Sequence, residues 1–169
     1  MKYKNTYLLA GIPVEMICTG EYLVRQCRDY ITDMTPEFSI EMTEDDIAAE
    51  KERSEDKSYS DGYYESLAFY RKLCDKIPDR GIILFHSCAV AVDGKAYLFT
   101  APSGTGKSTH ASLWKEILGE RVRIINGDKP LIRVTPGHIT VYGTPWNGKE
   151  RWGENSHADI AGICFLSRA

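Results

Sequence analysis

The pattern of hydrophobic positions divides this chain into many short strands and a few helices. Apolar side chains three and four positions apart predict helices over residues 21–31, 65–77 and 107–118. Thr43 with Asp46 three positions later matches a capping box and predicts one further short helix. Short apolar or alternating runs, which are typical of strands, lie at residues 7–12, 14–18, 38–42, 82–85, 89–92, 95–99, 122–125, 131–134, 139–142 and 160–166.

Turn residues join two pairs of these strands into hairpins. Asp93-Gly94 separates the runs at 89–92 and 95–99, and a D-G dipeptide between strands is typical of a two-residue hairpin. Pro136-Gly137 separates the runs at 131–134 and 139–142 in the same way. The small-residue loop after Phe99 therefore follows the second strand of a hairpin. In the ordinary doubly wound nucleotide fold, the corresponding loop ends a parallel strand reached through helical crossovers.

A charged stretch over residues 44–62 marks the boundary between two regions. Like-charged runs usually face solvent, so a solvated helix end and linker is favoured here over an acidic metal-binding patch. We expect residues 1–62 to form a small α+β region. Residues 63–169 are expected to form an α/β nucleotide-binding core with a mixed sheet.

Composition narrows the class of protein. The length of 169 residues suits one compact domain, or a core with an appendage, and the net charge of −3 gives no reason to expect nucleic acid as a partner. No apolar run approaches the roughly 20 residues of a membrane helix. The apolar run Tyr7–Ala10 is too short for a secretory signal, so we expect a cytoplasmic protein without a membrane partner. The scattered cysteines suggest buried free thiols rather than zinc ligands or disulfides: Cys18, Cys27, Cys74, Cys88 and Cys164.

The candidate chemistry is concentrated in the loop before the helix at 107–118. Its sequence, Ala101-Pro102-Ser103-Gly104-Thr105-Gly106-Lys107-Ser108, fits the Walker A pattern G-x-x-x-x-G-K-[ST], with Ala in place of the first Gly. Small residues let backbone N–H groups converge on phosphate oxygens, and the following helix adds the positive end of its dipole. In this pattern Lys107 reaches the β- and γ-phosphates and the Ser108 hydroxyl can hold Mg²⁺. The loop therefore predicts a nucleotide-phosphate site rather than a plain strand-to-helix turn.

Two residues outside the loop are further candidates. Asp128 follows the apolar strand at 122–125, at the strand end where ligand sites of α/β proteins gather. A carboxylate there can hold Mg²⁺ through water or accept a proton from an attacking hydroxyl, although a turn position alone would also explain it. His86 ends the apolar run at 82–85, where a lone histidine is more often structural, so its role stays open at this level.

Cations and tryptophans near the C-terminal end offer weaker signals. Four cations are candidates for neutralising phosphate charge, or else solvated surface residues: Lys129, Arg133, Lys149 and Arg151. Lys149 follows Gly148, which allows its loop to close over a ligand. Trp146 and Trp152 can stack on a base or peptide, or can anchor the loop by packing.

The order of these parts resembles the catalytic domain of HPr kinase/phosphorylase and, more distantly, ATP-dependent phosphoenolpyruvate carboxykinase. The resemblance covers residues 80–169 and is carried by the stretch from His86 to Asp128: a strand-end histidine, a hairpin, the phosphate loop and an acid after the next strand. It implies a phosphoenolpyruvate carboxykinase-like P-loop core, with Asp128 as base or metal-linked acid and His86 and Lys107 as site residues. It also implies that ATP and Mg²⁺ are held by Ser103, Gly104, Thr105, Gly106, Lys107, Ser108 and Thr109.

The chain departs from this family at several positions. HPr kinase has two adjacent acids where this chain has Gly127-Asp128, so one acid must do both jobs or rely on another residue. Ser87 stands where the family has glycine after the histidine. A later Arg-bearing segment of the family has no match up to Ala169, as a core truncated at its C-terminus would give. The first 75 residues look like the N-terminal part of small HPr-kinase-like proteins, some of which accompany peptide-modifying systems.

Motif and resemblance together predict an ATP- and Mg²⁺-dependent kinase that phosphorylates a hydroxyl, with Ser or Thr of a small protein or peptide as the expected acceptor. The alternative is a nucleotide-binding accessory or scaffold module without turnover, which the missing acid favours. A carboxykinase-like reaction would need further Arg, Lys and His ligands, which the sequence does not show. A second copy of the chain is another candidate partner, since an exposed apolar edge at residues 160–166 would invite strand pairing.

Overall fold

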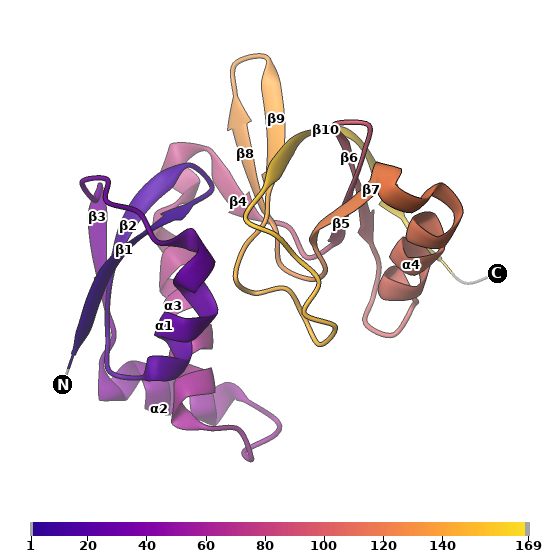
Figure 1. Cartoon of the computed structure of the whole chain (residues 1–169). Coiled ribbons are helices and arrows are strands. Elements are labelled where there is room, and N and C mark those ends of the chain that lie inside the picture. Colours follow the sequence, from indigo (N-terminus) through magenta and orange to yellow (C-terminus); the bar gives the residue numbers. More distant parts are fainter. Residues whose placement is uncertain (1, 168–169) are drawn as a thin grey trace. The chain divides into compact units, whose positions relative to one another are not determined.

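The computed structural model describes residues 2–167 and has a mixed α/β fold with two mixed sheets and four α-helices. The chain forms two compact units that divide between Asp79 and Arg80. The elements of the first unit are β1 (Tyr3–Leu9), β2 (Ile12–Cys18), α1 (Glu21–Cys27), β3 (Phe38–Glu41), α2 (Glu44–Arg53) and α3 (Asp61–Lys76). Those of the second are β4 (Ile82–Leu84), β5 (Cys88–Val92), β6 (Lys95–Thr100), α4 (Lys107–Leu118), β7 (Val122–Asn126), β8 (Leu131–Thr135), β9 (His138–Tyr142) and β10 (His157–Phe165) (Figure 1).

The first unit packs three helices with a three-stranded sheet ordered β1-β2-β3. β1 runs antiparallel and β3 parallel to the central strand β2. The β1–β2 turn lies at Ala10-Gly11, where both residues have positive φ angles, so β1 ends at Leu9 and not at Ile12 as the apolar run suggested. The capping box that was expected at Thr43 and Asp46 is confirmed and begins α2.

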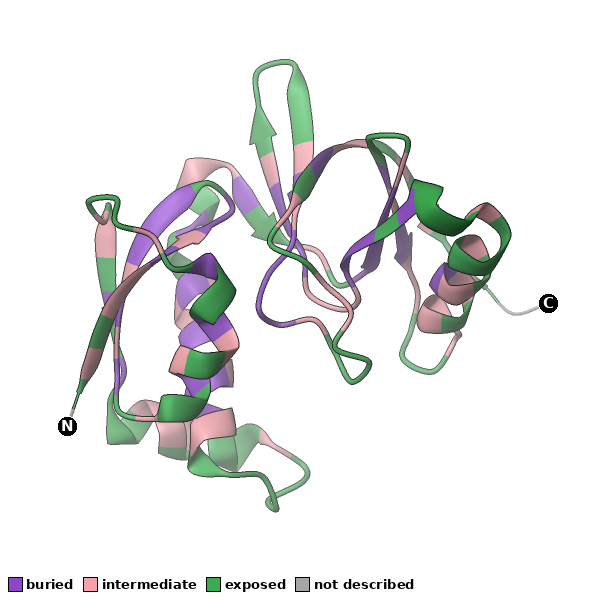
Figure 2. Cartoon of the chain, in the orientation of Figure 1, coloured by how far each residue is buried: buried purple, intermediate pink, exposed green. Residues whose placement is uncertain are grey.

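Helix α3 determines where the first unit ends. We expected a boundary near residue 62, but α3 begins at Asp61 behind the N-cap Ser60 and packs against α1, α2 and β3. Its buried face includes Tyr64, Phe69 and Leu73 (Figure 2). Because that face completes the core of the first unit, the division between the units lies after the helix. The charged stretch forms α2 and a connection over residues 54–60, both within the first unit.

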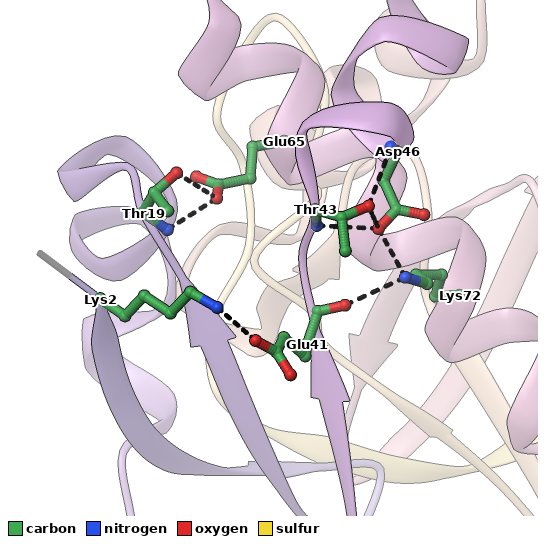
Figure 3. Close-up of polar contacts among 7 residues, drawn as sticks. All are labelled: Lys2, Thr19, Glu41, Thr43, Asp46, Glu65 and Lys72. Carbon is green, nitrogen blue, oxygen red and sulfur yellow. Dashed lines mark hydrogen bonds and ion pairs between the residues drawn. The ribbon is translucent and has the colours of Figure 1, made fainter.

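Buried and half-buried polar contacts tie α3 to the rest of the first unit (Figure 3). The Glu65 carboxylate accepts hydrogen bonds from the backbone N–H groups of Thr19 and Gly20, both at 2.8 Å, and from the Thr19 hydroxyl at 3.1 Å. Gly20 precedes α1 and has no side chain to cap it, so Glu65 supplies that cap from another helix. Lys72 Nζ donates to Asp46 Oδ2 at 2.6 Å, which links α3 to the start of α2.

The second unit contains a seven-stranded sheet ordered β4-β8-β9-β10-β6-β5-β7. Both expected hairpins are confirmed as antiparallel pairs, β5 with β6 and β8 with β9. Asp93 and Gly94 in the first turn have φ angles of 50° and 81°, the left-handed conformations that a tight two-residue hairpin requires. β6 and β10 run parallel, which makes the sheet mixed.

One face of this sheet is covered by α4, which lies against β5, β6 and β7 (Figure 1). Ala111 is the buried residue of this helix, while Trp114 and Leu118 pack partly buried against the same cluster. Helical spacing would place Ile117 close to this inward stripe, but the residue is 76% exposed. It lies on the outer side of the helix because the narrow contact stripe of α4 follows residues 111, 114 and 118.

The other face forms a second core because the sheet curls. β7 contacts β9 although three strands separate them in the sheet order. Small and medium apolar residues fill this concave side: Ala89, Ala91, Ala96, Leu98, Ile125, Ile132, Val141 and Ala158. β10 is an inner strand of this sheet, but it pairs with β9 only over residues 157–159, so residues 160–165 are paired on one side, with β6. Phe165 in this segment is 82% exposed. Pairing of residues 160–166 with another chain stays a prediction. Within residues 2–167, no helix is both long and apolar enough to cross a membrane.

Candidate functional site

Strand directions gather the candidate residues at one edge of the large sheet. β5 runs antiparallel to both β6 and β7, so β6 and β7 end at the edge where β5 begins. The loop at 101–106 leaves β6 at this edge, Asp128 follows β7, and His86 precedes β5. The register confirms the meeting, since Cys88 pairs with Phe99 and Ala89 with Asn126.

His86 and Asp128 form a direct side-chain pair. His86 Nε2 lies 2.9 Å from Asp128 Oδ1, with the histidine side chain 53% and the aspartate 28% exposed. The backbone fixes both residues, because Ser87 N–H donates to the Asp128 carbonyl at 3.1 Å and Thr100 Oγ1 donates to the His86 carbonyl at 3.0 Å. The sequence left the role of His86 open, and the fold places it against the candidate acid.

Asn126 holds the turn that carries Asp128. Its Oδ1 accepts from the backbone N–H groups of Asp128 and Lys129 at 2.9 and 2.8 Å. Its Nδ2 donates to the Thr144 carbonyl at 3.1 Å and to the Thr144 hydroxyl oxygen at 3.0 Å. We did not single out this buried asparagine from the sequence. The signal was its place two residues before the acid, where Asn commonly bonds to the backbone ahead of it.

The loop at 144–156 is fastened beside Asp128. Gly127 N–H donates to the Trp152 carbonyl at 2.8 Å, and Glu154 N–H donates to the Ile125 carbonyl at 3.1 Å. Gly148 has φ 82°, and a Cβ atom there would lie 3.0 Å from Asp128 Cβ. Any larger residue at position 148 would crowd Asp128, so the close approach of the loop backbone to the acid requires glycine. The turn that follows Gly148 therefore lies near Asp128.

The glycine-rich loop leads directly into α4. Gly104 and Gly106 have φ angles of 76° and 108°, and Gly106 is the N-cap of the helix. A glycine N-cap brings no side chain to the first helical N–H groups, which is the arrangement that suits an anionic ligand. Lys107 Nζ donates to the Ala101 carbonyl at 3.0 Å, so the lysine folds back over its own loop. Ser108 is half-buried, whereas Ser103 and Thr109 are exposed.

Three charged side chains influence the pKa of Cys88, the first residue of β5 at this edge. Burial raises the pKa of its thiol to about 12, with the Glu150 and Asp128 carboxylates raising it further and the Lys107 ammonium lowering it. All three charges therefore act on the same buried sulfur, although they come from three segments: the start of α4, the turn after β7 and the loop at 144–156. Glu150 is a residue that the sequence analysis missed. It lies in an irregular loop among other charges, where no periodicity or motif distinguishes it.

The remaining candidates divide into near and distant residues. Lys129 Nζ lies 3.6 Å from Asp128 Oδ2, while Arg133 lies on β8, which pairs with β4 and β9. Lys149 and Arg151 are exposed in the turn after Gly148. Trp146 is buried, and Trp152 packs partly buried against the core beneath α4, so both rings help to anchor the loop.

The donor chemistry of the site fits Mg²⁺. Among residues 2–167 no group of three or more His, Cys, Asp or Glu side chains is placed to hold a metal. Mg²⁺ does not need such a group, because it usually takes one or two carboxylates together with waters and substrate phosphates. The Ser108 hydroxyl and the Asp128 carboxylate are oxygen donors of the kind that it prefers.

Comparison with known proteins adds no family. No model of a protein family matches the chain, and a search of curated proteins gives no match. The resemblance to HPr kinase/phosphorylase is thus carried by the segment from His86 to Asp128 alone. Any function has to be argued from the geometry at the sheet edge.

Proposed function

We propose that this chain is an ATP- and Mg²⁺-dependent phosphotransferase of the HPr-kinase-like type. Its acceptor would be a hydroxyl, with Ser or Thr of a small protein or peptide as the leading candidate. The observation that carries the proposal is the His86–Asp128 pair, at 2.9 Å, on the sheet edge from which the glycine-rich loop leads into α4. Phosphoryl transfer to a hydroxyl needs a positioned carboxylate next to a phosphate-binding loop, and this edge offers both.

The nucleotide phosphates would be bound by the backbone N–H groups of Ser103–Thr109 and by Lys107. The ammonium of Lys107 is bonded to a neutral carbonyl, that of Ala101. A phosphate oxygen is a stronger acceptor than a neutral carbonyl, since charge-assisted hydrogen bonds are roughly twice as strong. Lys107 would therefore exchange Ala101 for the β- and γ-phosphates without a large rearrangement.

Asp128 would orient the acceptor hydroxyl and accept its proton. A bond forms between the acceptor oxygen and the γ-phosphorus, and the bond to the β,γ-bridging oxygen breaks and leaves its electrons on ADP. His86 keeps the carboxylate in position through Oδ1, and Asn126 fixes the backbone beneath it. Ser108 and Asp128 would hold Mg²⁺, which supplies positive charge to the phosphates when bound.

Glu150 would provide the second acid that Gly127-Asp128 lacks. Two observations support this role: the loop that carries Glu150 is fastened beside Asp128, and its carboxylate acts on the same Cys88 thiol as Lys107 and Asp128. A second carboxylate near the phosphates would share metal binding and leave Asp128 available for the hydroxyl. The surrounding thiols are free, which agrees with a site of action in the reducing cytoplasm.

A nucleotide-binding module without turnover is the second candidate function. It is favoured by the surroundings of Asp128, whose two oxygens face His86 at 2.9 Å and Lys129 at 3.6 Å. Both carboxylate oxygens thus already have side-chain partners, which would have to give way before Asp128 could take a hydroxyl. Such a module would bind ATP and present the first unit to a partner.

Lys107→Ala tests the proposal, with Lys115→Ala as a control on the same helix. We expect Lys107→Ala to weaken ATP affinity by at least roughly tenfold, as the loss of one charge-assisted contact implies, and Lys115→Ala to change it by less than twofold. Calorimetric titration measures both. Equal ATP affinity in the wild type and Lys107→Ala would refute nucleotide binding at this loop. Transfer of label from γ-labelled ATP to Ser- or Thr-containing peptides then separates the kinase from the module without turnover.

A further inference from the structure

A cavity of about 420 Å³ adjoins the glycine-rich loop and extends from it to side chains that have no role in the site described above. Besides the two loop glycines, its walls come from Thr105, Thr109, His110, Leu113, Leu166 and Ser167. Its volume falls within the roughly 300–1,000 Å³ of small-molecule sites. Thr105 and Thr109 belong to the phosphate-binding loop. The side chains of His110, Leu113, Leu166 and Ser167 have no role in the proposed phosphoryl transfer.

The walls combine two apolar side chains with polar groups at one end. Leu113, on the first turns of α4, is 47% exposed although it is a large hydrophobic residue. Leu166, in the segment after β10, lines the same cavity, and its N–H donates to the Thr100 carbonyl at 2.9 Å, which fixes its backbone. The His110 ring packs edge-on against Phe99, with ring centroids 4.5 Å apart, and is held there. Two fixed apolar walls suit a flat, weakly polar ring system.

The position of the cavity along α4 says which part of a nucleotide reaches it. Lys107, the residue that would hold the β- and γ-phosphates, donates to the Ala101 carbonyl directly after β6, at the sheet edge where Asp128 follows β7. Thr109 and His110 come two and three residues later on the helix and line the cavity. A triphosphate bound through this loop with its γ-phosphate near Asp128 therefore directs its α-phosphate, and whatever follows it, toward the cavity.

We propose that this cavity is the subsite for the nucleoside part of the nucleotide. The base would lie between Leu113 and Leu166, and the ribose hydroxyls would face the polar end at Thr105 and Thr109. The inference rests on the proposed function, because it needs a nucleotide on the glycine-rich loop. It adds the part of the ligand that the phosphate motif leaves undefined.

The test compares ATP with inorganic tripolyphosphate, which has the phosphates but no nucleoside. Calorimetric titrations would be made on the wild type, Leu113→Gln and Ile117→Gln. Ile117 is the matched control, one turn further along α4, exposed and not part of the cavity wall. We expect Leu113→Gln to weaken ATP affinity roughly five- to tenfold, because an apolar contact is lost. Tripolyphosphate affinity should stay within twofold, and Ile117→Gln should change neither.

The outcomes separate this inference from the proposed function. If Leu113→Gln binds ATP as tightly as the wild type does, the cavity does not take the nucleoside, while the phosphate site stands on the Lys107→Ala result. If Leu113→Gln weakens ATP and tripolyphosphate by the same factor, the substitution acts through the loop and the inference is overturned. If the wild type binds neither ligand, both the proposed function and the inference fall. Circular dichroism of both variants checks that the helix is retained.

Discussion

Two carboxylates, one in each unit, show two different uses of a negative charge. Glu65 in the first unit is 1% exposed and receives hydrogen bonds from Thr19 and Gly20, two of them from rigid backbone N–H groups. Asp128 in the second unit has a side chain that is 28% exposed and faces two other side chains, those of His86 and Lys129. The backbone partners of Glu65 are fixed and leave no room for a ligand. The partners of Asp128 are side chains, which can change rotamer, and its carboxylate stays accessible.

The helices of the two units differ in the same way. α3 buries seven residues, whereas α4 buries one, Ala111. A helix that is deeply packed holds a core together. A helix that rests on the sheet through a narrow stripe leaves its N-terminal turn and the loop before it open to solvent, where a ligand can bind. The comparison assigns stability to the first carboxylate and chemistry to the second, and substitutions can test each assignment.

Asp128→Asn should produce the largest effect, and it should be an effect on chemistry. Removal of a positioned general base typically costs about 10²–10⁴-fold in rate. The turn itself should survive, since Asn126 holds its backbone, so we expect the free energy of unfolding to change by less than about 1 kcal/mol. Label transfer from ATP measures the first quantity and urea unfolding the second.

Asp159→Asn is the matched control for Asp128→Asn. Asp159 also lies in the second unit and faces a cation, Lys95, at 3.5 Å, but on β10 away from the loop edge. Its substitution should leave transfer unchanged. Wild-type transfer by Asp128→Asn would remove this residue from the chemistry, whereas no transfer by the wild type itself would favour the module without turnover.

Glu65→Ala should produce the opposite result, a loss of stability without a direct effect on the nucleotide. The substitution leaves the N–H groups of Thr19 and Gly20 without their acceptor at the start of α1. An unsatisfied buried donor costs about 1–3 kcal/mol, and we expect a loss near the upper end because two donors share this carboxylate. Urea unfolding measures it. Glu21→Ala, at the exposed Glu21–Tyr3 contact, is the control; a Glu65→Ala loss no larger than that of the control would contradict the capping role.

Acid should weaken the first unit through Glu50. Two hydrogen bonds from Arg71, at 2.8 and 2.7 Å, hold the pKa of the Glu50 carboxyl below its ordinary value. A depressed pKa in the folded state means stability that is present above the ordinary glutamate pKa, about 4.3, and is lost as pH falls through the folded value. Since half of the Arg71 side chain is exposed, we expect Glu50→Gln to cost only about 1–2 kcal/mol at pH 7.

The difference in unfolding free energy between wild type and Glu50→Gln should therefore shrink between pH 7 and pH 3. Glu52→Gln is the control, because it changes an exposed acid on the same helix, α2. A difference that stays constant over this pH range would show that the Glu50–Arg71 contact does not contribute through ionisation.

Local signals in the sequence predicted much of the fold. The Asp93-Gly94 and Pro136-Gly137 turns, the capping box at Thr43 and the helix after the glycine-rich loop all depend on neighbouring residues, and all are confirmed. The register and order of the seven strands depend on packing between distant segments and were not predicted. For the same reason the charged linker was extended too far, since α3 begins four residues before its first expected position.

Candidate site residues could be named from the sequence where a motif exists, and could not where only the fold brings residues together. Lys107 and Ser108 are adjacent in a known pattern, and Asp128 follows a strand end. His86 became a candidate partner only when β5 and β7 were seen to meet at one edge. Glu150 lies in a loop held by backbone hydrogen bonds from Gly127 and Glu154, which no side-chain pattern encodes.

Ile117→Ser should give the smallest effect and sharpen the contrast between α3 and α4. Helical spacing predicted an inward position, but the side chain is 76% exposed, so we expect the free energy of unfolding to change by less than about 0.5 kcal/mol. Leu118→Ser is its matched neighbour. That residue packs partly buried on the core beneath α4, and its loss should cost about 1–2 kcal/mol. Urea unfolding of both variants measures the difference. If Ile117→Ser destabilises the protein as much as Leu118→Ser does, then Ile117 is covered in solution. In that case α4 is packed on its outer side as well, as α3 is.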